Sequence, residues 1–405
     1  MMEYNTYGLN ENEFINNLTP GQINELKEME VFTNDTTSYA YSRYYSDRIK
    51  YNRILSIYDI YSFNCNLNCT YCFENGIESS QSKNYMERLL FYKDFINLYY
   101  DDFDVLDFVL FGGEPLLNIN YIKQISEYLT DTFFDKVIDF SITTNGTLID
   151  KQVTDYINEY NVSEVRITLD GPEEIHNHRR PMHLKSSFKK TIEGLRTLCS
   201  DTSADIVINT IIDEDNKNFY QDLFKYLKNN FYDYFYKISF NVGKVCKPIN
   251  SKKSFGLINN EFNVSEYYSI MEYILKNGGT ITSPFYSCQC LNSTEKSFII
   301  SSDISIYKCV SAVGNNKFLL STFQDFKKDP NLFFKKNIKI IENSHRENCF
   351  SCKYLTMCNG GCKYDNYFNS KDICREYLLS QEIHGLINIL QQGSILKDGK
   401  IKKRY

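Results

Sequence analysis

Short apolar runs alternate with longer amphipathic segments between residues 54 and 245, and this alternation predicts the fold. The short runs predict buried strands at 54–61, 108–111, 137–143, 165–169, 206–212 and 238–242. Apolar residues at helical spacing predict helices at 86–99, 119–134, 150–160, 186–199 and 215–230. Strands that alternate with helices form a parallel sheet. We therefore predict an α/β fold, a partial barrel of six βα units with its functional groups at the carboxyl ends of the strands.

The pattern changes on both sides of this region. Near the N-terminus a polar, Asn-rich stretch contains one helix signal, with Thr19 as N-cap and Pro20 in the first turn. Beyond about residue 250 the βα rhythm stops and a second domain rich in cysteine follows. The predicted domains are a helical preface at 1–50, the barrel at 51–247, a linker or bridging region at 248–287, a cysteine-rich domain at 288–380, and a terminal helix and tail at 381–405.

Composition and charge narrow the class of partner. The chain has 405 residues and a formal net charge of −6, so no global basic field points to nucleic acid or to an anionic membrane. A basic start followed by an apolar segment is missing, and so is any long apolar stretch that would span a bilayer. We therefore expect a cytoplasmic protein that acts on a peptide or a small molecule.

The 13 cysteines do not read as a disulfide framework, because that would need an oxidising compartment and a secretion signal. They fall into two groups, one of three near residue 70 and one of eight in the last third of the chain. Cys199 and Cys246 stand apart from both groups. We expect these two to be ordinary thiols.

The first group, Cys65, Cys69 and Cys72, forms a CxxxCxxC run. It supplies three thiolates from one short loop and no fourth. A structural zinc site takes four ligands, whereas a four-iron cluster held by three thiolates keeps one iron open to a small molecule. The run therefore favours a cluster with an open iron over zinc or a purely structural loop.

With Tyr71 before its third cysteine, the run resembles the cluster loop of the radical S-adenosylmethionine (SAM) family, in which SAM on the open iron is cleaved to a 5′-deoxyadenosyl radical. The resemblance implies that Cys65, Cys69 and Cys72 are catalytic residues and metal ligands, and that a [4Fe-4S] cluster and SAM are cofactors. It also implies that Tyr71 helps to cradle the adenine.

Further motifs of this family stand at the predicted strand ends. Gly112-Gly113-Glu114-Pro115 resembles the GGEP motif that binds the amino group of SAM. Two glycines allow close backbone approach, and a carboxylate holds an ammonium. The resemblance, which covers residues 54 to about 245, assigns the ribose and carboxylate of SAM to Thr144, Asn145, Thr168, Asp170 and Arg180.

The second cysteine group resembles the SPASM domain, which holds two auxiliary four-iron clusters in radical SAM maturases. The resemblance assigns one cluster to Cys349, Cys352, Cys358 and Cys374. It assigns the other to Cys290, Cys309 and Cys362, with Cys288 as a possible fourth ligand. Zinc at these knuckle-like spacings is the alternative. The chain departs from the family at Ile304, where a glycine is usual, and we expect Ser302-Asp303 to make the turn there.

The resemblance implies a maturase that abstracts a hydrogen from a ribosomally synthesised peptide, leading to a thioether or other oxidative crosslink, with a reductant such as flavodoxin or ferredoxin. The first alternative is an anaerobic sulfatase-maturating enzyme, which makes formylglycine. That group carries an aspartate base directly after the cysteine that Cys309 matches, and here the next residue is Val310. A non-catalytic iron-sulfur protein that binds peptides or transfers electrons is the second alternative, and it would need a degraded cysteine run.

Overall fold

The computed structural model describes residues 53–77, 85–244, 264–282, 291, 294–342 and 401–402. The predicted preface at 1–50, the predicted terminal helix within 381–405 and most of the cysteine-rich domain lie outside these ranges. The proposed domain boundaries therefore stay a prediction.

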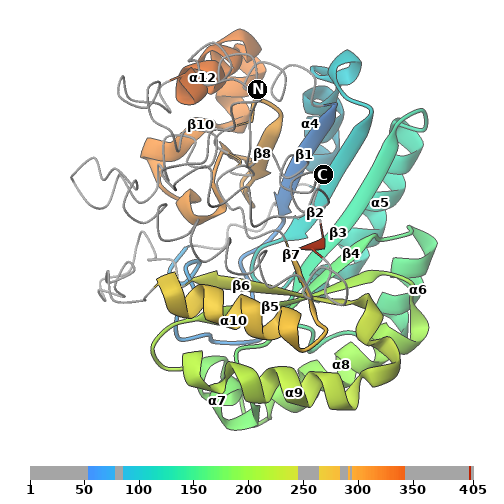
Figure 1. Ribbon diagram of the computed structural model, residues 1–405. Coiled ribbons are helices and arrows are strands. Elements are labelled where there is room, and N and C mark those ends of the chain that lie inside the picture. The colour runs from blue at the N-terminus through green and yellow to red at the C-terminus, as the bar shows by residue number, and fades with distance from the viewer. Residues whose placement is uncertain are drawn as a thin grey trace, which may run out of the picture.

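The six predicted strands and the five predicted helices occur in the predicted order, and a short helix at Glu173–Arg179 was not predicted (Figure 1). The strands are β1 Ile54–Ile60, β2 Val105–Phe111, β3 Val137–Thr144, β4 Glu164–Thr168, β5 Asp205–Ile212 and β6 Ile238–Lys244. The helices are α4 Tyr85–Asn97, α5 Ile119–Thr132, α6 Lys151–Glu159, α7 Glu173–Arg179, α8 Ser187–Asp201 and α9 Tyr220–Asn230. Each strand pairs in parallel with the next in the chain, which confirms the predicted α/β class.

The strands form because each presents an apolar face to the helices, and the helices begin at side chains that cap them. Asp150 accepts a hydrogen bond from Val153 N at 3.1 Å at the start of α6. Ser186 does the same for Lys189 N at 3.2 Å at the start of α8. Short 3-10 turns complete the description, at Tyr100–Asp102, Pro115–Asn118, Lys217–Phe219, Tyr232–Lys237, Val310–Ala312 and Asn316–Phe318.

The sheet continues beyond the six predicted strands into the last third of the chain. The later elements are α10 Val264–Lys276, β7 Thr280–Thr282, β8 Ser297–Ile300, β9 Ile306–Tyr307, β10 Leu319–Ser321, α11 Phe323–Lys328, α12 Pro330–Glu342 and β11 Ile401–Lys402. Within the described residues the strand order is β10-β9-β8-β1-β2-β3-β4-β5-β6-β7-β11. The segment 248–287, predicted as a linker or bridging region, thus contributes α10 and β7 to the barrel side of the sheet.

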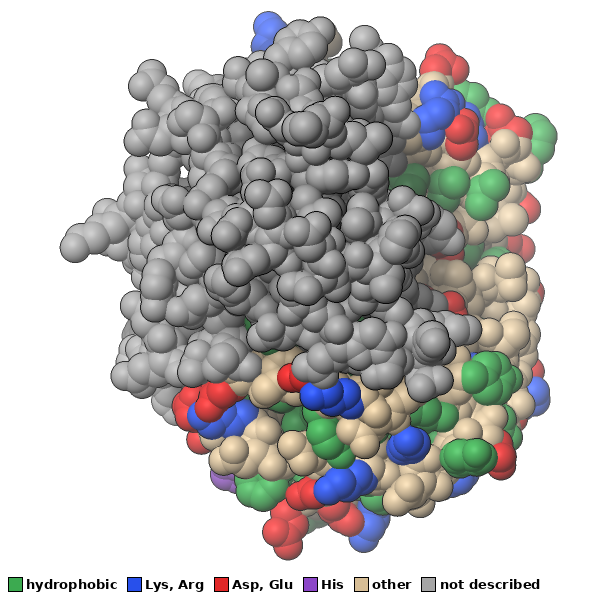
Figure 2. All heavy atoms as spheres, viewed as in Figure 1, with side chains coloured by type: hydrophobic (Ala, Val, Ile, Leu, Met, Phe, Trp, Pro, Cys, Tyr) green, Lys and Arg blue, Asp and Glu red, His purple; other side chains and the backbone are tan. Residues whose placement is uncertain are grey.

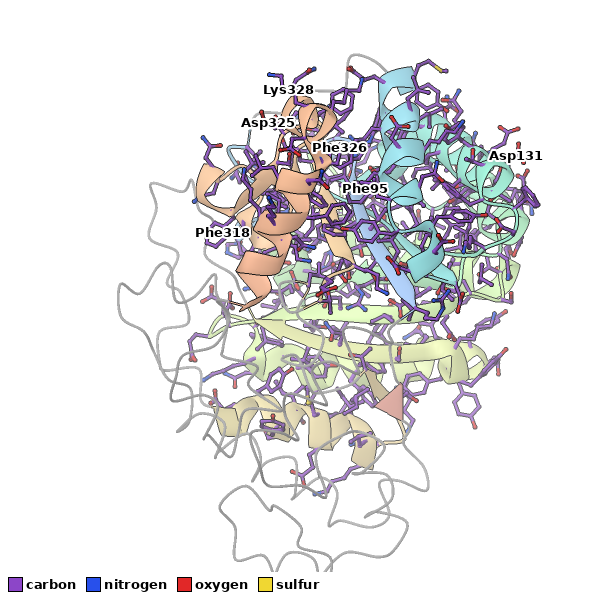
Figure 3. All side chains as sticks on the ribbon, turned by 90° about the horizontal axis from the view of Figure 1, so that it is seen from above. Phe95, Asp131, Phe318, Asp325, Phe326 and Lys328 are labelled. Atoms are coloured by element: carbon purple, nitrogen blue, oxygen red, sulfur yellow. The ribbon has the colours of Figure 1, made fainter. Side chains whose placement is uncertain are left out.

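Aromatic side chains attach the C-terminal elements to the barrel. Figure 3 shows Phe95 on α4 and Phe326 on α11 pointing toward each other, with ring centroids 5.6 Å apart. Phe95 also meets Phe298 of β8 at 5.1 Å and Phe333 of α12 at 5.7 Å. These rings are buried, and aromatic pairs in such edge or tilted arrangements add to the stability that burial provides.

A buried ion pair links the same elements. Arg88 of α4 is fully buried and pairs with Asp59 of β1 through Nη2, which also lies 3.3 Å from the carbonyl oxygen of Ile300. Its Nη1 donates to the carbonyl oxygen of Ser301 at 2.8 Å. Tyr92 and Tyr121 also donate to the Asp59 carboxylate, the latter at 2.8 Å. Arg88 therefore connects the first βα unit with the turn that follows β8.

That turn contains the residue at which the chain departs from the family. Ile304 is buried and has a φ of 63°, a conformation that a glycine adopts without strain. Asp303 accepts hydrogen bonds from the backbone N and the hydroxyl of Ser305, both at 3.0 Å, and Ile304 N donates to Ser301 O at 2.9 Å. The turn between β8 and β9 therefore forms with isoleucine in place of glycine, held by the Asp303 carboxylate and by burial of the side chain.

Charge on the described part of the face in Figure 2 is mixed, with Lys and Arg interspersed among Asp and Glu. None of the helices that the structure describes is long and apolar enough to cross a membrane.

Candidate functional site

The cysteine run lies in the loop that follows β1, and the ends of other βα units hold this loop. Asn68 N donates to Pro181 O at 3.0 Å and Thr70 N to Arg179 O at 2.9 Å, which fixes the loop to the end of α7. Glu114 N donates to Asn64 O at 2.8 Å on the β2 side. The loop is thus seated across the carboxyl ends of the strands, where the fold was predicted to place its functional groups.

The predicted Gly112-Gly113 turn is required by this close approach. Gly113 has a φ of 47°, and a Cβ there would lie 2.3 Å from Asn64 O. Gly112 has a φ of 87°, and its Cβ would lie 2.4 Å from Cγ2 of Ile60. A larger residue at Gly113 would collide with the segment that leads into the cysteine loop, and one at Gly112 would collide with the last residue of β1.

Glu114 is fully buried and ties the end of β2 to the end of β3. Its Oε1 accepts from Thr144 Oγ1 at 2.7 Å and from Leu116 N at 3.0 Å, and its Oε2 accepts from Asn145 N at 2.7 Å. Burial raises the pKa of Glu114, and these donors oppose that effect. Glu114 and Thr144 are therefore joined by a hydrogen bond between their side chains. Their contacts with SAM stay a prediction.

Asn145 joins β3 to the cysteine loop. Its Nδ2 donates to Asn66 Oδ1 at 2.8 Å and lies 3.9 Å from Cys65 Sγ. Its Oδ1 accepts from the backbone N and the hydroxyl of Thr147, at 2.9 and 2.6 Å. Asn66, which the sequence did not single out, completes the ring by donating to Thr147 Oγ1 at 2.8 Å.

Asp170, Tyr71 and Arg180 meet in a buried chain of hydrogen bonds. The Tyr71 hydroxyl donates to Asp170 Oδ2 and accepts from Arg180 at 2.7 Å. Asp170 Oδ1 accepts from Ile211 N at 3.1 Å. Burial raises the pKa of Tyr71 well above its ordinary value. The structure therefore brings together three residues predicted from distant motifs. The Tyr71 hydroxyl lies between the Arg180 guanidinium and the Asp170 carboxylate and orients both side chains.

Arg179 and His176 contact the residues of this hydrogen-bonded network: Arg179 contacts Tyr71, and His176 contacts Asp170. Arg179 Nη1 donates to both carboxylate oxygens of Asp213, each at 2.7 Å, and the guanidinium carbon of Arg179 lies 4.8 Å from the centre of the Tyr71 ring. His176 is fully buried, and its Nδ1 accepts from Asp170 N at 3.3 Å. Thr168, the remaining predicted residue, is buried at the end of β4.

The three thiols differ in exposure, and no disulfide joins any of them. Cys65 is exposed, Cys72 is half-buried and Cys69 is buried. Although part of Cys65 reaches the surface, its sulfur is largely shielded from water, and this desolvation raises the pKa of Cys65 to about 11. Desolvation likewise raises the pKa of Cys72 to about 12. No three His, Cys, Asp or Glu side chains in the described ranges converge on a single metal ion. In a four-iron cluster each thiolate binds a different iron, so the three cysteines need not converge on one point.

Two buried polar atoms beside the cysteine loop have no hydrogen-bond partner among the described residues. Glu74 accepts from Gly113 N at 2.8 Å through Oε2, while its Oε1 is buried and accepts no hydrogen bond from the described residues. Burial raises the pKa of Glu74 to about 7. Arg180 Nε is likewise buried and unpartnered within the described chain. A carboxylate and a guanidinium with spare capacity beside the cysteine loop match an α-ammonium and an α-carboxylate. Glu74 was not among the predicted residues, although its place two residues after Cys72 was a visible signal.

Of the predicted auxiliary-cluster ligands, the structure describes Cys309 alone. It is half-buried and directly precedes the 3-10 turn Val310–Ala312. The other seven lie outside the described residues, namely Cys288, Cys290, Cys349, Cys352, Cys358, Cys362 and Cys374. Cys199 is a buried free thiol, as expected, and Cys246 is not described.

Comparison with known proteins agrees with this geometry. The Radical SAM superfamily model matches residues 60–228. The chain is 27% identical over 373 residues to the radical SAM cyclopropyl synthase TigE of Paramaledivibacter caminithermalis, covering 81% of this chain and 73% of that protein. It is 25% identical over 329 residues to the cysteine-type anaerobic sulfatase-maturating enzyme of Clostridium perfringens, covering 75% of this chain and 86% of that enzyme.

Among solved structures, native anSMEcpe with bound AdoMet and Cp18Cys peptide matches with a TM-score of 0.65 at 23% identity, covering 85% of this chain and 99% of that one. The barrel, its cysteine loop and these matches define the class, and the chain is a radical SAM enzyme. It is related to the anaerobic sulfatase-maturating enzymes and to SPASM peptide maturases.

Proposed function

We propose that this enzyme is a radical SAM/SPASM maturase of a ribosomally synthesised peptide, in which hydrogen abstraction leads to a thioether or another oxidative crosslink. The observation that carries the proposal is the cysteine loop seated beside the spare carboxylate oxygen of Glu74 and the spare guanidinium nitrogen of Arg180. The name of the sulfatase-maturating relative supports a maturase, and the peptide in the matching solved structure supports a peptide substrate.

In this proposal the loop cysteines hold the cluster, and the residues around them hold SAM. When bound, cluster and SAM together supply a 5′-deoxyadenosyl radical that removes a hydrogen atom from the substrate. Glu74 and Arg180 bind the charged end of SAM, and Tyr71 keeps Arg180 in place through its hydroxyl. The other predicted contacts are Gly112, Gly113, Glu114, Thr144, Asn145, Thr168 and Asp170.

The cysteines of the last third hold two auxiliary four-iron clusters in this proposal, and a flavodoxin or ferredoxin supplies the electron for SAM cleavage. Cys309 fits a ligand role, because it is half-buried at the start of a turn close to the strand β9. A cluster there would accept the second electron that the substrate loses, after the hydrogen atom has been removed, to complete its oxidation.

The residue after Cys309 favours a crosslink over formylglycine. Val310 packs against the apolar cluster that contains Ile60, Ile299 and Tyr307. Formylglycine formation needs a base to take a proton from the substrate, and a valine side chain cannot do so. The second candidate is still formylglycine formation, favoured by the similarity to the sulfatase-maturating enzyme of Clostridium perfringens.

A sulfatase-derived Cys-x-Pro-x-Arg peptide separates the two candidates. We expect that anaerobic incubation with the reconstituted enzyme, SAM and dithionite produces 5′-deoxyadenosine but no formylglycine. Mass spectrometry of the peptide is the measurement, and a variant with all three loop cysteines changed to Ala controls for non-enzymatic cleavage of SAM. Loss of the cysteine sulfur with gain of an aldehyde would reverse the ranking of the two candidates.

A further inference from the structure

The segment between α7 and α8 contacts the cysteine loop at the surface of the molecule. Arg179 O accepts a hydrogen bond from Thr70 N at 2.9 Å, and Pro181 O accepts one from Asn68 N at 3.0 Å. These two bonds lie on either side of Cys69, a predicted ligand of the loop cluster. Thr70, Asn68 and Pro181 are exposed. The segment therefore offers a short route from the solvent to the backbone that holds the cluster.

The same segment then turns back in a tight loop with an exposed end. Met182 and Lys185 form an isolated antiparallel bridge, in which Lys185 N donates to Met182 O at 3.4 Å. His183 and Leu184 stand between them and are exposed, Leu184 to 91%. We call residues 181–185 the α7–α8 tip.

Leu184 has a backbone conformation that packing does not explain. Its φ is 54°, in the left-handed region that few residues other than glycine and asparagine adopt. Two other non-glycine residues of the described chain have a positive φ. Asn161 is of a type that tolerates it, and Ile304 is buried in the turn after β8. Strain at an exposed leucine, where burial gives nothing in return, points to a role in function.

The tip lies in a cationic stretch of a chain whose net charge is −6. Residues 178–190 contain five Lys and Arg, two His and neither Asp nor Glu, and the segment 61–73 contains no acidic residue either. The exposed Lys185 makes no ion pair with any residue that the structure describes. The other four cations have carboxylate partners, namely Asp213 for Arg179, Asp170 for Arg180, Glu173 for Lys189 and Glu193 for Lys190. An anionic protein, repelled by the chain as a whole, would therefore find an attractive charge at the tip.

Position and charge together indicate a protein that delivers electrons. In the proposed function the loop cluster receives an electron from outside, and the tip belongs to the exposed segment that is bonded on both sides of Cys69. Transient electron-transfer complexes have small interfaces, and charges steer their encounter. An exposed leucine beside an unpaired lysine suits an interface of this kind.

We propose that the α7–α8 tip is the docking site of an acidic electron-transfer protein of the flavodoxin or ferredoxin class, with Leu184 as the apolar contact and Lys185 as the attracting charge. One electron leaves the donor, which is oxidised, and enters the loop cluster, which is reduced; no atom or proton is transferred at this contact. The proposal rests on the proposed function, because it assumes that a protein reduces the cluster on the cysteine loop.

Two variants test the tip, and each has a matched control. Leu184→Gly removes the apolar side chain and suits the left-handed backbone, so it should fold at least as well as the wild type. Lys185→Glu reverses the charge. The controls are Phe134→Ala, at an exposed side chain that precedes β3, and Lys93→Glu, on the exposed side of α4.

Two measurements on the anaerobic, reconstituted full-length enzyme separate docking from chemistry. Production of 5′-deoxyadenosine is driven either by flavodoxin with its NADPH-dependent reductase or by dithionite, a small reductant that needs no docking site. Surface plasmon resonance gives the Kd for oxidised flavodoxin without turnover, at about 50 mM and about 300 mM NaCl to vary the screening of charges.

We expect each tip variant to weaken both flavodoxin binding and flavodoxin-driven cleavage about tenfold, the effect of losing one apolar contact or one close charge. The dithionite-driven rate should change less than about twofold. Binding by Lys185→Glu should also depend less on salt than binding by the wild type, because the attraction that salt screens is gone. Both controls should behave as the wild type does.

Equal flavodoxin binding by the wild type and both tip variants would overturn the proposal, and so would a wild type that binds neither flavodoxin nor a ferredoxin. An equal loss with dithionite would assign the tip to SAM cleavage instead of docking. An acidic octapeptide that binds the wild type and is lost in both variants, while flavodoxin binding persists, would assign the tip to a peptide. The proposed function fails separately, if the wild type with dithionite produces no 5′-deoxyadenosine.

Discussion

At the scale of single residues, each cysteine of the loop has a different polar neighbour. Cys65 lies near the Asn145 amide, while Cys69 is influenced by the charge of Arg180 and Cys72 by that of Glu74. Hydrogen bonds and charges at the sulfurs tune the potential of an iron-sulfur cluster. The three thiols are therefore not equivalent, although the sequence presents them as one motif.

Replacing Cys65, Cys69 and Cys72 together by Ala should abolish reductive cleavage of SAM, because only this loop leaves an iron open in the proposed arrangement. The auxiliary clusters should stay in place. Iron analysis and a 5′-deoxyadenosine assay on the anaerobic variant provide the measurement. Undiminished 5′-deoxyadenosine would show that the assignment of this loop is wrong.

His176 should make the folded state sensitive to mild acid. Burial, followed by the charges of Arg180 and Arg179, lowers the pKa of His176 well below its ordinary value. The folded protein keeps the imidazole neutral, while the unfolded chain takes up a proton below about pH 6.5. Because the pKa is lowered in the folded state, the stability is present above that pH and is lost as the pH falls.

The variant His176→Asn keeps an acceptor for Asp170 N and removes the titrating group. Between about pH 6.5 and pH 5, its free energy of unfolding should fall less steeply than that of the wild type, by up to about 1.4 kcal/mol per pH unit. Urea unfolding at several pH values measures both slopes. Parallel slopes would contradict the prediction.

At the scale of elements, Arg88 connects α4, β1 and the turn after β8 through charge and through carbonyl oxygens. The Phe95 contacts with β8, α11 and α12 join the same elements through apolar burial. Cys309 lies only two residues after β9, so these contacts also set the position of a predicted cluster ligand relative to the barrel.

Arg88→Met should destabilise the protein by about 3–5 kcal/mol, because it leaves the Asp59 carboxylate buried without its counter-ion. Adding Asp59→Asn should recover part of that loss, since the second change removes the uncompensated charge. Urea denaturation of the wild type, the single variant and the double variant measures the effect. A single variant as stable as the wild type would show that the pair does not hold these elements together.

At the scale of the whole molecule, the eleven described strands form one sheet that carries elements from the last third of the chain at both ends. β8, β9 and β10 extend the sheet beyond β1, and β7 and β11 extend it beyond β6. The described strands β10 and β11, which precede and follow the cysteines at 349–374 in the sequence, therefore lie at opposite edges of the sheet.

Wild-type enzyme reconstituted without oxygen should contain about three four-iron clusters per chain, one on the loop and two on the later cysteines. Iron and zinc analysis together with the visible absorption spectrum provides the measurement. A zinc-loaded, colourless form of the variant that lacks the three loop cysteines would instead favour zinc at the C-terminal cysteines.

The strands β1 to β6, the helices α4, α5, α6, α8 and α9 and the cysteine loop were predictable from the sequence, because strand and helix patterns repeat locally and the loop motif spans eight residues. The short helix α7 was not predicted. Gly112-Gly113 was also visible as a strand-end turn. Long-range contacts were not predictable in this way. Tyr71 and Arg180 are 109 positions apart, yet they share a hydrogen bond.

The sequence by itself determined the α/β class, the order of the βα units and the three thiols of the loop, since each depends on neighbours in the chain. The tertiary structure alone decided that Glu114 is held by Thr144 and Asn145, that Glu74 reaches Gly113, and that the side chains of Asn209 and Asn241 share a hydrogen bond across two strands. The physical reason is strand register. Register sets which residues of separate strands lie side by side, and local spacing along one chain does not record it.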